Sequence, residues 1–171
     1  MHMKKIFLVL ITLAGIMACG NADAKETEAD NGLVEIFESY TEAKGVQYFN
    51  LEGFTLKMAR PKIRKTPVGN AADGIESLYI FAMKDVKKEV KAKFVKEAEA
   101  VFGTYEMALE TNEKGKKSRI FIKKTQPEII DEMIIYSMEN DPVVIYMVGE
   151  IPVAEMKGVE APQQTEAAEA K

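Results

Sequence analysis

Four strand-like segments follow one another closely in the second half of the chain. They are "TYEMALET" (104–111), "SRIFIKK" (118–124), "IIDEMIIYSM" (129–138) and "VVIYMVGE" (143–150). The first alternates apolar and polar residues, which is typical of a half-buried strand, and the last is apolar almost throughout, as a central strand is. Because consecutive strands with short links pair antiparallel, this segment predicts a mostly antiparallel sheet.

The first half of the chain adds helices and one more strand. "LVEIFESYTEAK" (33–44) and residues 85–102 carry apolar side chains at helical spacing, and "IESLYIFAM" (75–83) is apolar enough for a buried strand. Between them we expect a turn or two of helix over residues 54–59 and a loop over residues 61–74. The predicted fold is α+β, with a mostly antiparallel sheet of about five strands and two main helices packed on one face.

The start of the chain has the features of a secretory signal. Lys4 and Lys5 precede thirteen uncharged residues, Ile6 to Ala18. That stretch is too short to span a bilayer, which takes about 20 apolar residues, but it has the length of a signal hydrophobic region. The chain is therefore expected to be exported.

The only cysteine of the chain directly follows this apolar stretch. The tetrapeptide Ile16-Met17-Ala18-Cys19 resembles a bacterial lipobox, in which the cysteine is acylated and becomes the mature N-terminus. The competing site is the small-x-small tripeptide ending at Ala24, and cleavage there would discard Cys19. We expect lipidation of Cys19, with palmitate among its acyl chains and membrane attachment as the result.

These features divide the chain into four parts. Residues 1–18 are expected to be a lipoprotein signal peptide, residues 19–31 the acylated cysteine with a flexible acidic tether, and residues 32–157 a single α+β domain. Residues 158–171 are expected to form a disordered tail. The location expected is the cell envelope, with the lipid anchor in the outer membrane and the domain on its periplasmic or surface face.

The composition after Cys19 limits the available chemistry. That part of the chain has no Cys, His or Trp, so disulfides within the domain, a catalytic triad and zinc sites lack their ligands. Asp131 and Glu132 are adjacent on a strand, so their side chains point to opposite faces and cannot form a carboxylate pair. We therefore expect no catalytic residue, no metal and no cofactor. The methionines are expected to fill the core.

The charge of the chain is acidic overall but has one basic stretch. The net charge is −4, which disfavours nucleic acid as a partner. The segment "KMARPKIRK" (57–65) nevertheless carries five basic residues and no acid, and it is either a solvated loop or a patch for an acidic partner or anionic head groups. The basic residues of this patch are Lys57, Arg60, Lys62, Arg64 and Lys65.

The order and rhythm of these segments resemble a known family. "IIDEMIIYSMENDPVVIYMVGEIPVAEM" (129–156), preceded by "SLYIFAM", the lysine-rich helix and "YEMALETNEKGKKSRIFIKK", is similar to the family catalogued as domain of unknown function 4252. Those proteins are short exported lipoproteins of Bacteroidetes, and the similar part spans about residues 33–157. The resemblance implies an envelope lipoprotein and supplies no activity or site residues.

Three functions are consistent with the sequence. The leading hypothesis is a non-enzymatic, lipid-anchored envelope protein that binds a macromolecular partner or a small ligand through the sheet face or the 57–65 patch. The first alternative is a hydrolase of envelope polymers that uses carboxylates, tyrosine and lysine. The second is an envelope-stress regulator that acts by interaction alone. The sequence does not define an oligomeric state.

Overall fold

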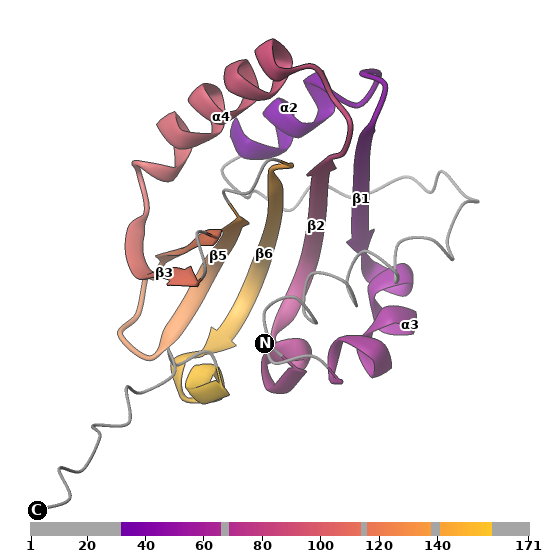
Figure 1. Cartoon of the computed structure of the whole chain (residues 1–171). Coiled ribbons are helices and arrows are strands. Elements are labelled where there is room, and N and C mark those ends of the chain that lie inside the picture. The colour runs from indigo at the N-terminus through magenta and orange to yellow at the C-terminus, as the bar shows by residue number, and fades with distance from the viewer. Residues whose placement is uncertain (1–31, 66–68, 114–115, 138–140, 159–171) are drawn as a thin grey trace, which may run out of the picture.

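The computed structural model describes residues 32–65, 69–113, 116–137 and 141–158. Within these residues the fold is α+β, with a six-stranded antiparallel sheet and three α-helices (Figure 1). The predicted class and the predicted antiparallel pairing are confirmed. Cys19 and the segments expected to be the signal and the tether lie outside the described residues, as does the expected tail except for Gly158.

The sheet has the strand order β1-β2-β6-β5-β4-β3, and every neighbouring pair is antiparallel. The strands are β1 (Val46–Glu52), β2 (Ile75–Met83), β3 (Glu106–Glu113), β4 (Lys116–Lys123), β5 (Ile129–Ser137) and β6 (Val143–Pro152). The expected number was about five, and β1 is the strand that the sequence did not predict. The apolar β6 lies inside the sheet, as its composition indicates.

The helices divide between the two faces of the sheet. They are α2 (Gly32–Ser39), α3 (Gly53–Ile63) and α4 (Lys88–Phe102), and the short 3-10 helices are η1 (Gly69–Asp73) and η2 (Val153–Gly158). The two predicted main helices, α2 and α4, pack side by side on one face (Figure 1). α3 packs on the opposite face, which the sequence did not predict.

The α2 and α4 face has an aromatic core. Phe81 of β2 stacks between Phe37 of α2 and Phe94 of α4, with ring centroids 4.8 and 4.6 Å apart. All three side chains are fully buried. Phe102 at the end of α4 stacks on Phe121 of β4 with centroids 5.1 Å apart. Aromatic stacking therefore attaches both helices to the sheet.

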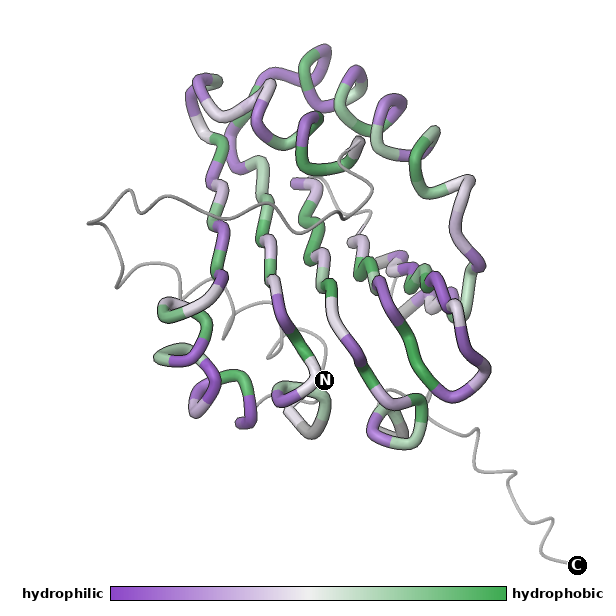
Figure 2. The backbone as a smooth tube through the Cα atoms, turned by 180° about the vertical axis from the view of Figure 1, so that it is seen from behind, coloured by the Kyte–Doolittle hydropathy of each residue, from purple (hydrophilic) through white to green (hydrophobic). Residues whose placement is uncertain are grey.

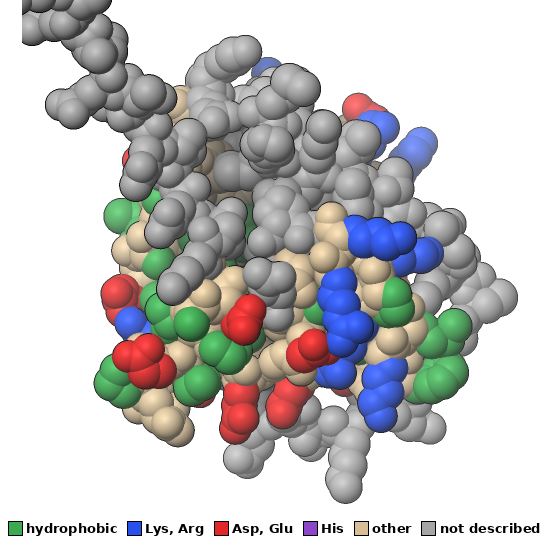
Figure 3. Space-filling view, turned by 90° about the horizontal axis from the view of Figure 1, so that it is seen from below, with side chains coloured by type: hydrophobic (Ala, Val, Ile, Leu, Met, Phe, Trp, Pro, Cys, Tyr) green, Lys and Arg blue, Asp and Glu red, His purple; other side chains and the backbone are tan. Residues whose placement is uncertain are grey.

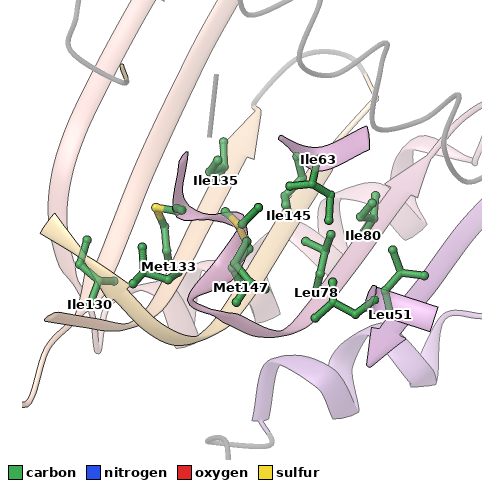
Figure 4. Close-up of a cluster of buried hydrophobic side chains, with 14 of the residues drawn as sticks. Leu51, Ile63, Leu78, Ile80, Ile130, Met133, Ile135, Ile145 and Met147 are labelled. Carbon is green, nitrogen blue, oxygen red and sulfur yellow. The ribbon is translucent and has the colours of Figure 1, made fainter. Parts of the chain in front are cut away.

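The opposite face has an aliphatic core. Leu78 and Ile80 of β2 alternate with Tyr79 and Phe81, so each set reaches its own face of the sheet. Figure 4 shows Ile63 of α3 among the strand side chains of this cluster. Figure 2 shows hydrophobic and hydrophilic residues alternating along α3 and α4, as expected of helices with one buried side.

The start of α3 is defined by residues before the basic stretch. The backbone N–H of Glu52 donates to Thr55 Oγ1 at 3.2 Å, and that hydroxyl donates to the Glu52 carbonyl at 2.7 Å. The helix continues through Pro61, which lies in its last turn, and the N–H of Arg64 donates to the carbonyl of Arg60 at 2.9 Å. The predicted loop over residues 61–74 is therefore wrong for Pro61 to Ile63, which are helical, and for η1.

Candidate binding surface

α3 is apolar on two sides, and only one of them is buried. Leu56, Ala59 and Ile63 are each 1% exposed and face the sheet. Phe54 and Met58 lie on the other side, where their side chains are 75% and 57% exposed. Residues four apart are neighbours on a helix, so these two side chains form a continuous apolar ridge in solvent.

Lysines flank this ridge. Lys57 and Lys62 are exposed on α3, and Lys65 is exposed in the turn that follows. Because residues three or four apart are neighbours on a helix, Lys57 lies beside Phe54 and Lys62 lies beside Met58. Together with the exposed Pro61 they form what is called here the α3 surface. It consists of Phe54, Lys57, Met58, Pro61, Lys62 and Lys65.

The two arginines of the predicted patch have partners inside the protein. Arg60 is half-buried and its Nη2 donates to the carbonyl oxygen of Ile75 at 2.9 Å. Arg64 Nη2 lies 2.6 Å from a carboxylate oxygen of Asp73 in η1. Within the described residues, the three lysines make no ion pair. The five basic residues lie on α3 or in the turn after it, and a binding role for them stays a prediction.

The α3 surface lies at the end of the molecule opposite α2 and α4 (Figure 1). Viewed from that end, Lys and Arg side chains gather on one side, with hydrophobic side chains beside them, and acidic side chains gather on the other side (Figure 3). The segment from Gly53 to Lys65 contains no acidic residue. The surface therefore combines exposed apolar area with local positive charge on an acidic protein.

A second candidate is a buried carboxylate in the sheet. Glu132 of β5 is 7% exposed and accepts hydrogen bonds from the hydroxyls of Tyr105 and Tyr146, both at 2.5 Å. Lys123 Nζ lies 3.2 Å from its other oxygen. A bulge between Ile130 and Glu132 accompanies this placement. All of the carboxylate's contacts are internal, so the cluster is best explained as a satisfied buried network.

Tyr146 and Tyr79, on neighbouring strands of the sheet, are held in the neutral phenol form. Burial, and then the hydrogen bond to Glu132, raise the pKa of Tyr146 above the usual tyrosine range. Tyr79 stacks on Tyr146 with ring centroids 5.5 Å apart, and burial followed by its 2.5 Å bond to Glu52 raises its pKa too. A raised pKa keeps both side chains in the phenol form at neutral pH, so neither supplies a phenolate as a base or nucleophile, which is the opposite of activation for catalysis.

The adjacent Asp131 and Glu132 diverge, as the strand geometry predicts. Asp131 is half-buried and binds the backbone N–H and the hydroxyl of Thr125, whereas Glu132 points into the Tyr105 and Tyr146 cluster.

The described residues contain no group of three or more His, Cys, Asp or Glu side chains arranged to hold a metal ion. Across the same residues, no helix is both long and apolar enough to cross a bilayer.

The sequence did not identify the exposed apolar residues. All methionines after Cys19 were expected in the core, but Met58 and Met107 are 57% and 55% exposed. Met83, Met133 and Met147 are buried as predicted, and Met138 lies outside the described residues. A usable signal for Phe54 and Met58 was their spacing of four, out of phase with Leu56, Ala59 and Ile63.

Comparison with known proteins identifies a family but no activity. The family model described as "Domain of unknown function (DUF4252)" matches residues 40–159, which is most of the chain and includes the α3 surface. No curated protein and no solved structure matches the chain.

Proposed function

We propose that this chain, which belongs to the family described as "Domain of unknown function (DUF4252)", is a lipid-anchored envelope protein that acts by binding an anionic partner through the α3 surface. The observation that carries the proposal is the exposure of Phe54 and Met58 between lysines on an acid-free helix. Large apolar side chains gathered on a charged surface are typical of interaction sites.

Binding is favoured over catalysis by the state of the polar groups. The carboxylates of Glu132 and Glu52 accept hydrogen bonds from tyrosines whose pKa values are raised. The sequence after Cys19 contains neither His nor Cys, the residues most often used as general bases and nucleophiles at neutral pH. The apolar side chains of the α3 surface project from a helix and are mostly exposed, whereas enzyme sites are concave and enclose their ligands.

Membrane attachment through Cys19 is supported by the lipobox-like sequence before it. We expect the protein to incorporate an alkyne analogue of palmitate during growth, and we expect Cys19→Ala to abolish that labelling completely. The measurement is in-gel fluorescence after coupling a dye to the alkyne. Undiminished labelling of the Cys19→Ala protein would disprove the anchor.

Binding through the α3 surface can be tested by photo-crosslinking in the producing cells. We expect a photoreactive amino acid in place of Met58 to give crosslinked adducts, with proteins detected on gels and lipids by mass spectrometry. The same amino acid in place of Met107 is the control, because Met107 is similarly exposed but lies on β3. Its adduct yield is expected to be at background.

Matched charge variants show whether the adducts depend on the α3 lysines. Lys57→Gln, Lys62→Gln and Lys65→Gln combined should lower the adduct yield by at least about tenfold, since a basic residue close to an anionic surface contributes about 1 kcal/mol. Lys84→Gln, Lys88→Gln and Lys96→Gln change the charge equally at exposed positions elsewhere. If position 58 gives no adduct, or if both triple variants behave alike, the α3 surface is not the binding site.

A further inference from the structure

The three exposed cations of the α3 surface are all lysines. The arginines beside them are engaged, Arg60 by the carbonyl oxygen of Ile75 and Arg64 by the carboxylate of Asp73. Arginine is the residue that recognises one phosphate or carboxylate with a fixed two-point geometry, whereas lysine acts as a mobile point charge. The lysine charges, which no ion pair within the described residues offsets, therefore suit a layer of many anionic groups better than one defined anion.

The apolar ridge between these lysines also has a defined shape. Phe54 and Met58 project from a helix whose other side is held by Leu56, Ala59 and Ile63 against the sheet. A ridge of this kind enters the interfacial layer of a bilayer, where aromatic and thioether groups lie below the head groups. Lysines on both sides of such a ridge keep their ammonium groups at the head-group level while their methylene stems follow the apolar side chains.

The length of chain before the domain allows this contact. Twelve residues separate Cys19 from Gly32, where α2 begins, so the thirteen Cα–Cα steps between them can span at most about 45 Å when extended. The strands that separate α2 from the α3 end are nine or ten residues long, or about 30 Å. An anchor at Cys19 can therefore reach a membrane on which the α3 end rests.

We infer that the anionic partner is the head-group layer of a lipid bilayer, into which Phe54 and Met58 insert while Lys57, Lys62 and Lys65 contact anionic lipids. The inference rests on the proposed binding role of the α3 surface and names its partner. The anchor would hold the domain near the membrane, and the α3 surface would fix its orientation there. The acidic remainder of the protein would face away from the anionic lipids.

The test uses the full-length protein attached to vesicles and a fluorescent amino acid in place of Met58. The vesicles contain a lipid that quenches fluorescence at the interface, in either pure phosphatidylcholine or an equal mixture with phosphatidylglycerol. We expect quenching at position 58 on the mixed vesicles, weaker quenching on phosphatidylcholine, and loss of the difference at high salt. The same fluorescent amino acid in place of Met107 should remain unquenched on both kinds of vesicle.

Charge variants make the outcome quantitative. Lys57→Gln, Lys62→Gln and Lys65→Gln together should shift the ratio of docked to undocked domain by about a hundredfold, at about fivefold per lysine. The matched Lys84→Gln, Lys88→Gln and Lys96→Gln variant should dock like the parent. Equal quenching at positions 58 and 107 overturns the inference. If position 58 still crosslinks to a protein in cells, the binding surface stands and only the bilayer is excluded as its partner.

Discussion

Replacing Phe94 by alanine is expected to lower the free energy of unfolding by about 4 kcal/mol. The Phe94 ring is fully buried, stacks on Phe81 at 4.6 Å and meets the edge of Tyr40 at 5.5 Å. Alanine would leave a cavity beneath α4 and remove the contact that joins α2, α4 and β2. Urea unfolding monitored by circular dichroism measures the change, and a loss of this size is a large part of the stability of a single domain.

Phe54→Ala is the matched control, because it is the same chemical change on an exposed side chain. Phe54 is 75% exposed, so its removal should change the free energy of unfolding by no more than about 0.5 kcal/mol. The pair also separates stability from binding, since Phe54→Ala is expected to weaken membrane docking. Similar destabilisation by both variants would mean that Phe54 is packed and the apolar ridge of the α3 surface does not exist.

The strands that the sequence predicted well are those with one consistent pattern. β2 has the predicted bounds, Ile75 to Met83, because nearly every side chain of an interior strand with two covered faces is buried. β5 and β6 are also apolar on both faces and begin at the predicted residues. Continuous apolar runs bounded by polar turns are the signal that a single sequence carries most clearly.

β1 and α3 lacked such a signal. β1 lies at the edge of the sheet, and its half-buried residues Val46, Tyr48 and Phe49 share no single period. Whether such a segment forms a strand depends on pairing with its neighbour β2, and the local sequence carries no information about that pairing. In α3, Pro61 indicated a helix end, and it does remove one backbone hydrogen bond, but the bond from Arg64 to the carbonyl of Arg60 still closes the last turn.

The sequence predicts the charge of the candidate site but not its exposed apolar side chains. Charge is a property of the sequence, so the basic residues from Lys57 to Lys65 could be found without coordinates. Exposure depends on packing. When a helix has two apolar sides, the sequence does not show which side is buried, because that is decided by the side on which the sheet packs. The buried position of Glu132 likewise depends on Tyr105 and Tyr146, which are 27 and 14 residues away in sequence.

The second large effect is expected at alkaline pH. Burial raises the pKa of Tyr136 to about 12 and that of Tyr48 above the usual tyrosine range. Burial with a hydrogen bond to a glutamate raises the pKa of Tyr40 to about 12 and also raises the pKa of Tyr146 and of Tyr79. In the unfolded chain these phenols ionise near pH 10. Above pH 10 the folded protein therefore binds more protons than the unfolded chain, and the free energy of unfolding falls as pH rises. Below pH 10 this contribution to stability is complete.

The expected loss is steep because five groups act together. A tyrosine that stays neutral only in the folded state lowers the free energy of unfolding by up to about 1.4 kcal/mol per pH unit. Because the unfolded phenol is only half ionised at pH 10, each group contributes about 1 kcal/mol between pH 10 and 11, and the five together contribute about 5 kcal/mol. Urea unfolding at pH 9, 10 and 11 measures this fall, and tyrosinate absorbance reports the ionisation.

Tyr136→Phe provides the control, since it removes one ionisable hydroxyl while keeping the ring beside Phe102. The slope of the free energy of unfolding against pH should then become shallower by about a fifth, because one of five titrating groups is gone. An unchanged slope would show that Tyr136 ionises alike in the folded and unfolded states. A free energy of unfolding that stays constant from pH 9 to 11 would contradict the neutral state of all five tyrosines in the folded protein, and with it the packing of α2 and α4 on the sheet.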